Sequence, residues 1–323
     1  MLGIALMLVS GGTVAGESSA AQPATPVLIG ALTDSWGPTP AVVGLRDGLV
    51  ELGYRENEHF MIGVRFTQGD PAELPVAAQQ LVERGASILV TTAGGANAAT
   101  AARMASDRVP IVFIGGSDPV GMGMVRSLAR PGGNITGVAD LDAELAPKRL
   151  QHFKELVPGL KRVLLPYDAG DPYAVSQLDE HREAARRVGV TLVERPLRTQ
   201  DEARAALLAV RKSEVDGILS PRNLSLNIPG FVLETAPRRA IPTMFYNSWH
   251  VERGGLASYS PNTYQLGRQA ARLVDKIIRG AKPADVPVEQ ATMFELVINL
   301  KTAKLLGLTV PPSLLLRADR LIE

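Results

Sequence analysis

The sequence predicts an α/β fold of two similar lobes, each built on a parallel sheet with helices on both faces. Short apolar runs that suit buried strands alternate with longer amphipathic runs that suit helices. A series of such elements between Gly53 and Pro110 recurs roughly 130 residues later, between Gly189 and Pro242. The apolar run 111–114 (IVFI) also ends in a glycine-rich polar turn, GGSDP. Such a turn is either an ordinary strand-to-helix connection or a ligand site, because open α/β sheets bind ligands beyond the carboxyl ends of their strands.

The first lobe is expected to hold four strands and three helices in alternation. Apolar spacing predicts a helix over residues 40–52, which Gly53 ends. Asp70, followed by Pro71, has the pattern of a helix N-cap, and its helix runs to about residue 83. The remaining elements are strands at 27–33, 61–66, 87–91 and 111–114, and a helix at 96–105.

The second half of the chain repeats the pattern after a turn-rich stretch. A helix is expected over residues 140–155, and the strand at 162–166 opens the second α/β series. Towards the C-terminus, the sequence predicts a strand after the glycines at 254–255, a helix at 264–278, a strand at 294–298 and a helix at 300–306.

Composition excludes several classes of function. The 323 residues are 46% hydrophobic, which is enough for a large core. The 34 basic and 33 acidic residues nearly balance, at a net charge of +1, which argues against nucleic acid or an anionic membrane surface as the partner. Cysteine is absent, which excludes disulfides, cysteine nucleophiles, thiolate metal sites and a lipid attached to cysteine.

The first 25 residues are expected to be an export signal and its flank. An apolar stretch at 2–9 precedes a small, polar run at 10–21, and the triplet SAA at 19–21 resembles a cleavage site ahead of Gln22. A frayed cytoplasmic N-terminus is the alternative, since no positive charge precedes the apolar stretch. The prediction is a periplasmic, exported, soluble protein that is not a lipoprotein.

Candidate ligand-binding residues lie where predicted strands end, because two facing lobes would line a cleft with these positions. In the first lobe they are Asp34, Ser35, Trp36, Ala93, Gly94, Gly95, Ser117 and Asp118. In the second lobe they are Tyr167, Asp168, Arg222, Asn223, Tyr246 and Asn247.

Each type of candidate has an expected role and a plainer alternative. Backbone N–H groups at residues 92–96 could hold a carboxylate at a helix start, or form a plain glycine turn. Arg222 could clamp a carboxylate, or lie in solvent. Asp34 or Asp118 could pair with an ammonium group, or cap a turn. Three aromatic residues could sandwich an aromatic ligand, or pack in the core: Trp36, Tyr167 and Tyr246.

No pattern indicates catalysis or a metal. The four histidines have no metal-ligand spacing and are expected on the surface: His59, His152, His181 and His250. No GxSxG motif is present. We therefore expect no catalytic residue, no metal and no cofactor.

Several longer sequence segments are typical of one family. They are GLRDGLVELGY at 44–54, SDPVG at 117–121, SLARPGGNITGV at 127–138, KRLQHFKELVPGLKRV at 148–163, GGLASYSPN at 254–262 and the tail at 277–323. On these segments the chain resembles the substrate-binding proteins of ABC transporters, in the uncharacterised group related to the tryptophan- and tyrosine-binding TrpX-like proteins. The resemblance covers nearly everything after the export signal.

The resemblance implies a type I periplasmic-binding-protein architecture, with two Rossmann-like lobes and three interlobe crossings. The crossings are expected near residues 138–147, 255–259 and 287–292. The first lobe would then comprise residues 26–138 and 258–286, and the second residues 139–257 and 287–323.

The resemblance also implies a function: delivery of a small ligand to an ABC permease in the inner membrane, with aromatic amino acids as the best-known ligands. The expected protein is a non-enzymatic monomer that closes over a carboxylate-bearing ligand, either an amino acid or an aromatic acid. The ligand could differ from the family's known ligands, because the sequence at residues 167–168, 221–223 and 246–249 departs from the family pattern. An extracytoplasmic ligand sensor and a two-lobed racemase or isomerase remain the alternatives.

Overall fold

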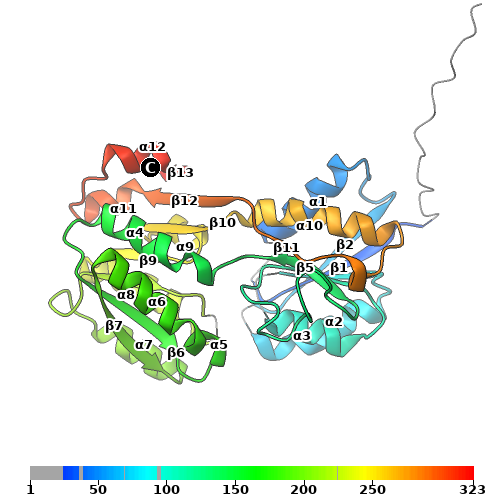
Figure 1. The fold of residues 1–323 in the computed structure, drawn as a ribbon, viewed down its shortest axis with the longest axis horizontal. Coiled ribbons are helices and arrows are strands. Elements are labelled where there is room, and N and C mark those ends of the chain that lie inside the picture. Colours follow the sequence, from blue (N-terminus) through cyan, green and yellow to red (C-terminus); the bar gives the residue numbers. More distant parts are fainter. Residues whose placement is uncertain (1–24, 36–38, 69, 93–95, 224) are drawn as a thin grey trace, which may run out of the picture.

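Two lobes lie side by side in the computed structural model, which describes residues 25–35, 39–68, 70–92, 96–223 and 225–323 (Figure 1). Each lobe contains one sheet between two layers of helices, which confirms the predicted α/β class. Within the described part of the chain, no helix has both the length and the apolar character needed to cross a membrane.

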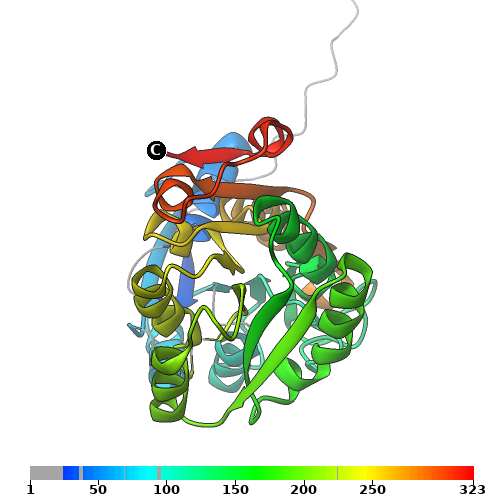
Figure 2. The ribbon, with the colours of Figure 1, turned by 90° about the vertical axis from the view of Figure 1, so that its left-hand side faces the viewer.

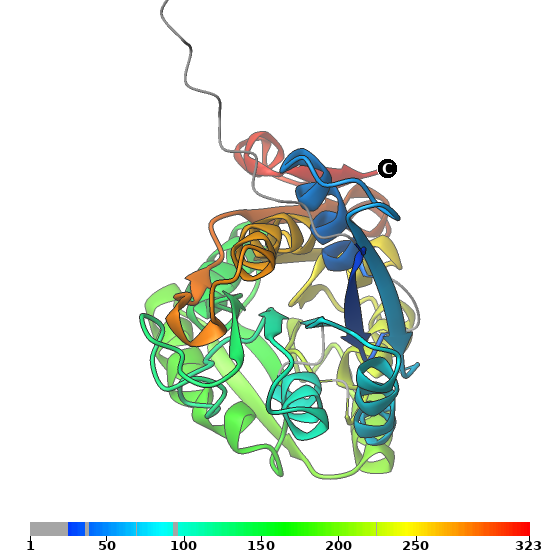
Figure 3. The same ribbon diagram turned by 90° about the vertical axis from the view of Figure 1, so that its right-hand side faces the viewer.

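The first lobe is built on a six-stranded, fully parallel sheet in the order β11-β5-β4-β3-β1-β2. Helices α1 and α10 cover one face, and α2 and α3 the other (Figure 3). The strands are β1 (Val27–Thr33), β2 (Phe60–Phe66), β3 (Ile88–Thr92), β4 (Ile111–Ile114), β5 (Ile135–Ala139) and β11 (Glu289–Gln290). The helices are α1 (Pro40–Glu51), the 3-10 turn η1 (Pro71–Glu73), α2 (Leu74–Glu83), α3 (Ala96–Ala105), α10 (Thr263–Ile278) and η3 (Pro283–Asp285).

The second lobe is built on a seven-stranded sheet in the order β13-β12-β10-β9-β8-β6-β7. Its pairs are parallel except β10 with β12. Helices α4 and α6 pack on one face, and α7 and α8 on the other (Figure 2). The strands are β6 (Arg162–Asp168), β7 (Thr191–Leu197), β8 (Gly217–Ser220), β9 (Thr243–Phe245), β10 (Ala257–Pro261), β12 (Phe294–Asn299) and β13 (Arg320–Ile322). The helices are η2 (Ala143–Leu145), α4 (Ala146–Leu156), α5 (Pro172–Ser176), α6 (Leu178–Val188), α7 (Gln200–Ala209), α8 (Ile228–Arg239), α9 (Ser248–Glu252), α11 (Leu300–Leu305) and α12 (Pro312–Arg317).

The chain passes between the lobes three times, and one passage, the second, differs from its expected position. The first follows β5, within the expected range. Residues 258–261 belong to β10 in the second sheet, so the chain leaves that lobe after residue 261. Residues 289–290 form β11 in the first sheet, so the last passage follows residue 290. The glycines at 254–255 make the turn before β10 rather than the passage itself, and the two polar residues of β11 carry no apolar pattern that would reveal a strand.

Two helix starts show how local sequence shapes these elements. The side chain of Asp70 accepts a hydrogen bond from the N–H of Ala72, which confirms the predicted N-cap. The helix expected from residue 140 instead begins at Ala146, after the short turn η2. Leu141 has a φ of 58°, a left-handed conformation that helices do not accommodate. Residues 140–142 are therefore free to contact the second lobe.

Candidate functional site

The carboxyl ends of strands from both sheets meet between the lobes. Asp140 directly follows β5 of the first lobe, and Arg222 follows β8 of the second. Arg222 Nη1 donates a hydrogen bond to Asp140 Oδ2 over 2.9 Å, and the pair joins the lobes. The prediction that the strand ends of the two lobes face one another is thus confirmed at this position.

Asp140 is held by the first lobe as well as by Arg222. Its carboxylate accepts hydrogen bonds from the N–H of Gly116 (3.0 Å), the hydroxyl of Ser117 (2.8 Å) and the N–H of Asp142 (3.1 Å). Burial alone would raise the pKa of Asp140, but Arg222 and these hydrogen bonds hold the pKa below its usual range. Asp140 is therefore an ionised, buried anchor for the arginine of the opposite lobe.

Arg222 also lies close to a second carboxylate and to a tyrosine. Asp34, at the end of β1, is 6% exposed, and its Oδ1 has no hydrogen-bond partner among the described residues. Burial raises the pKa of Asp34, and the positive charge of Arg222 partly offsets this. Burial likewise raises the pKa of Tyr246 to about 12, against the opposing effect of Arg222. The predicted residues Asp34, Arg222 and Tyr246 therefore share one electrostatic environment.

Arg149 connects two segments that lead from one lobe to the other, the stretch after β5 and the strand β10. Its Nε donates to the carbonyl of Tyr259 in β10 over 2.7 Å, and its Nη1 donates to the carbonyl of Asp142 over 3.2 Å. Its Nη2 forms an ion pair with the Asp142 carboxylate. The first passage is thus fastened to β10, which leads into the second.

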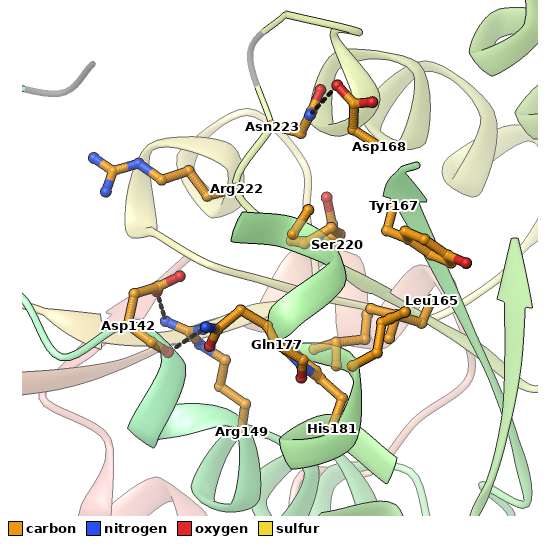
Figure 4. Close-up of a pocket in the computed structure, with 14 residues that line it drawn as sticks. Asp142, Arg149, Leu165, Tyr167, Asp168, Gln177, His181, Ser220, Arg222 and Asn223 are labelled. Carbon is orange, nitrogen blue, oxygen red and sulfur yellow. Dashed lines mark hydrogen bonds and ion pairs between the residues drawn. The ribbon is translucent and has the colours of Figure 1, made fainter. Parts of the chain in front are cut away.

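A pocket opens in the second lobe beside Arg222 (Figure 4). Its base is apolar, and its rim carries charges of both signs. It is lined by Asp142, Arg149, Leu165, Tyr167, Asp168, Ala174, Gln177, Leu178, His181, Leu219, Ser220, Pro221, Arg222 and Asn223. Apolar side chains together with polar groups that can fix a ligand's orientation are typical of small-molecule sites.

Asp168 lies at the upper rim of this pocket, next to Asn223 (Figure 4). The N–H of Gly170 donates to Asp168 Oδ1 over 2.8 Å. Asn223 and Ser225 approach Oδ2 only at 3.4 Å, which is long for a hydrogen bond. No cation is paired with Asp168 in the described part of the chain. Its carboxylate can therefore accept a donor from a ligand.

The other predicted residues have local roles or fall outside the described ranges. Asp118 is exposed and accepts the N–H of Gly121 over 2.7 Å, which matches the turn-capping alternative. Asn247 is bonded to the ring of His250 over 2.7 Å, and Ser35 to the hydroxyl of Thr33 over 3.0 Å. Four of the predicted site residues lie outside the described residues: Trp36, Ala93, Gly94 and Gly95.

Sequence reasoning missed several residues of this site. They are Asp140, Asp142, Arg149, Gln177, His181 and Ser220. Asp140 and Ser220 could have been found by the strand-end rule, because one follows β5 and the other ends β8. Arg149, Gln177 and His181 lie on or next to helices among charged residues, and no local signal marks them.

The expectation that the histidines are on the surface is wrong. His59, His152 and His250 are only 4–6% exposed, and His181 lines the pocket. The rings of His152 and His250 pack against Tyr259 and Phe245, with centroids 5.0 Å and 4.9 Å apart. Burial lowers the pKa of both His152 and His250 to about 4.

We expect these two histidines to make the protein less stable as the pH falls from 6.5 to 5. In this range the unfolded chain binds protons that the folded protein excludes, so the free energy of unfolding falls with pH. Each histidine contributes up to about 1.4 kcal/mol per pH unit. Urea unfolding at several pH values measures the slope, and His152→Leu should make the slope smaller. An unchanged slope in this variant would contradict the assignment.

Comparison with known proteins gives matches of three kinds: a family model, a relative and solved structures. The model of a family described as ABC transporter substrate binding protein matches residues 8–322. A tyrosine-binding protein of Clostridioides difficile (strain R20291) is 26% identical over 267 residues, which are 82% of this chain and 76% of the relative.

Two solved structures match with a TM-score of 0.81 and cover 92% of this chain and 100% of their own. One is a conserved domain protein from Vibrio cholerae O1 biovar El Tor, 29% identical. The other is an ABC domain in complex with L-Trp from Streptococcus pneumoniae, 28% identical.

Proposed function

This chain belongs to the family of ABC transporter substrate-binding proteins, and from that premise we propose that it is the solute-binding component of an importer. It works outside the cytoplasm as a monomer, binds a small ligand between its lobes and presents it to a permease in the membrane. Residues 1–25 hold the export signal and its flank in this proposal. The observation that carries it is the pocket beside the interlobe pair of Arg222 and Asp140.

The ligand we propose is an α-amino acid with an aromatic side chain. Relatives that bind tyrosine and L-Trp support the class. The charges support an ammonium group, because both arginines at the cleft already pair with aspartates, Arg222 with Asp140 and Arg149 with Asp142. Asp34 in the first lobe and Asp168 in the second then supply carboxylate oxygens for a cation. The start of α3, next to residues 93–95, remains the predicted site for the ligand carboxylate.

Binding acts through closure of the lobes in this proposal. A ligand that touches both lobes stabilises the closed arrangement by its difference in affinity for the two states. The pair of Arg222 and Asp140 is a direct contact between the lobes. In this proposal the hinge consists of the passages between the lobes. Arg149 links the first passage to β10, which leads into the second, and so restricts the direction in which the lobes can close.

A thermal-shift screen tests the proposal. The panel holds the common amino acids, aromatic acids without an amino group, sugars and dicarboxylates. At 100 times its dissociation constant a ligand adds about 2.7 kcal/mol of stability, which shifts the Tm by several degrees. We expect aromatic amino acids to give the shifts. Hits confined to sugars or dicarboxylates would contradict the ligand class, and mass spectrometry of the denatured protein detects a ligand carried through purification.

The same samples separate binding from catalysis. We expect the ligand to be recovered with its handedness and composition unchanged after long incubation with the protein. Racemisation of an L-amino acid, read by chiral chromatography, would instead support the isomerase alternative.

Asp34→Asn is expected to weaken binding of the amino acid about tenfold, because a hydrogen bond between charged groups becomes a weaker one. The deaminated analogue of the same ligand, which lacks the ammonium group, should bind both proteins alike. Calorimetry measures both affinities. Asp118→Asn is the matched control, because Asp118 is exposed and caps its own turn. Equal losses in the two variants, or an equal loss for the analogue, would remove Asp34 from the ammonium site.

A further inference from the structure

The inner end of the pocket lies between helix α6 and the strands β6 and β8. Leu165 of β6 and His181 of α6 lie there (Figure 4). Leu219 of β8 and Leu178 of α6 also line the pocket. The three leucines are at most 6% exposed. A ligand group that enters here meets these apolar side chains, with His181 as one of the polar groups beside them.

The hydrogen bonding of His181 fixes which of its nitrogens can meet a ligand. Nδ1 lies 2.8 Å from the carbonyl oxygen of Gln177. A carbonyl oxygen only accepts hydrogen bonds, so Nδ1 carries the proton. Burial lowers the pKa of His181, so the ring is neutral near pH 7. Nε2 is therefore a hydrogen-bond acceptor, and no bond to it is present among the described residues.

Two further polar atoms at the pocket have no hydrogen-bond partner in the described part of the chain. They are the hydroxyl oxygen of Ser220, whose residue is 1% exposed, and Oε1 of Gln177. Buried polar atoms without a partner cost free energy in a folded protein. With Nε2 of His181, the pocket thus offers two acceptors, and a hydroxyl that can both donate and accept.

We infer that His181 determines specificity by accepting a hydrogen bond from the ligand's side chain, so that the pocket selects an aromatic side chain that carries an N–H or O–H donor. The inference rests on the proposed function and names the side-chain end of that same site. The aromatic body packs on the three leucines, and the ring donor meets Nε2. A side chain without a donor leaves the buried acceptors unpaired, and a site built for a hydrogen bond rejects such analogues.

The test compares ligands of nearly the same shape on the full protein by calorimetry. L-Trp is measured against 3-benzothienyl-L-alanine, in which sulfur replaces the ring N–H, and L-Tyr against L-Phe. We expect the member of each pair that has a donor to bind at least about tenfold more tightly. Affinities equal within about threefold in both pairs would overturn the inference and leave the proposed function standing. Binding of none of the four amino acids would overturn both.

His181→Leu supplies the second arm. The variant removes the acceptor and puts an apolar side chain in its place. The affinity for L-Trp divided by the affinity for its sulfur analogue should therefore fall to about one. His152→Leu is the control, because His152 is buried in α4 and does not line the pocket. The role of His181 would be overturned if this affinity ratio is unchanged in His181→Leu, or if it falls equally in His152→Leu. If the variant does not fold, the ligand pairs measured on the unchanged protein still decide whether the pocket selects a side chain with a hydrogen-bond donor.

Discussion

Arg149→Met is expected to lower the free energy of unfolding by about 3–5 kcal/mol, the usual cost of removing one partner from a buried ion pair. Arg149 is 4% exposed, and its guanidinium donates to the Tyr259 carbonyl and to both the carbonyl and the carboxylate of Asp142. Methionine replaces the apolar part of the side chain but none of these donors. The Asp142 carboxylate loses its ion pair, and two carbonyl groups lose a donor.

Urea unfolding of the full protein measures this loss. Glu155→Gln is the matched control on the same helix, because it weakens the pair of Glu155 with Arg317, which is partly exposed. Such surface pairs are worth about 0–1 kcal/mol. The double variant Arg149→Met with Asp142→Asn should be less destabilised than the sum of the single variants, since the uncompensated charge is gone. A loss in Arg149→Met no larger than that of the control would show that the hinge does not depend on this contact.

The chain shows why some of the site could be predicted and some could not. Arg222 and Asp34 were found because each lies just beyond the end of a strand, and strand ends of parallel sheets gather at one edge. Asp140 obeys the same rule but was assigned to a helix, because the apolar spacing that follows it continues into α4. The left-handed backbone at Leu141 and the turn η2 separate Asp140 from that helix, and no local pattern predicts the left-handed residue.

Arg149 and His181 were missed for a different physical reason. Each lies in a helix with many charged neighbours, where a polar residue usually faces solvent. Arg149 is buried because β10, more than 100 residues later in the chain, brings the Tyr259 carbonyl to it. His181 lines the pocket because α6 packs beside the carboxyl ends of β6 and β8. Such contacts depend on how distant elements pack, and the periodicity of a single helix does not contain that information.

Arg222→Ala is expected to open the lobes rather than to unfold them. Arg222 contacts Asp140 across the interlobe boundary, so its loss leaves the buried carboxylate without its cation only while the lobes stay together. Separation of the lobes gives Asp140 water in place of the arginine and thereby limits the cost. The free energy of unfolding should therefore fall less than in Arg149→Met, and the radius of gyration without ligand, from small-angle X-ray scattering, should rise.

Ligand affinity should fall about 10- to 100-fold in the same variant, because the closed state loses a charged hydrogen bond worth about 1.5–3 kcal/mol. We expect this loss to arise from closure and not from a carboxylate clamp, since Nη1 of the guanidinium already donates to Asp140. Two ligands distinguish the causes: the amino acid and its decarboxylated amine should lose affinity by the same factor if closure is responsible. A loss confined to the amino acid would instead mean that Arg222 leaves Asp140 on binding and holds the ligand carboxylate. Arg253→Ala, which removes an arginine stacked on Trp249 in the second lobe, should change neither affinity nor scattering.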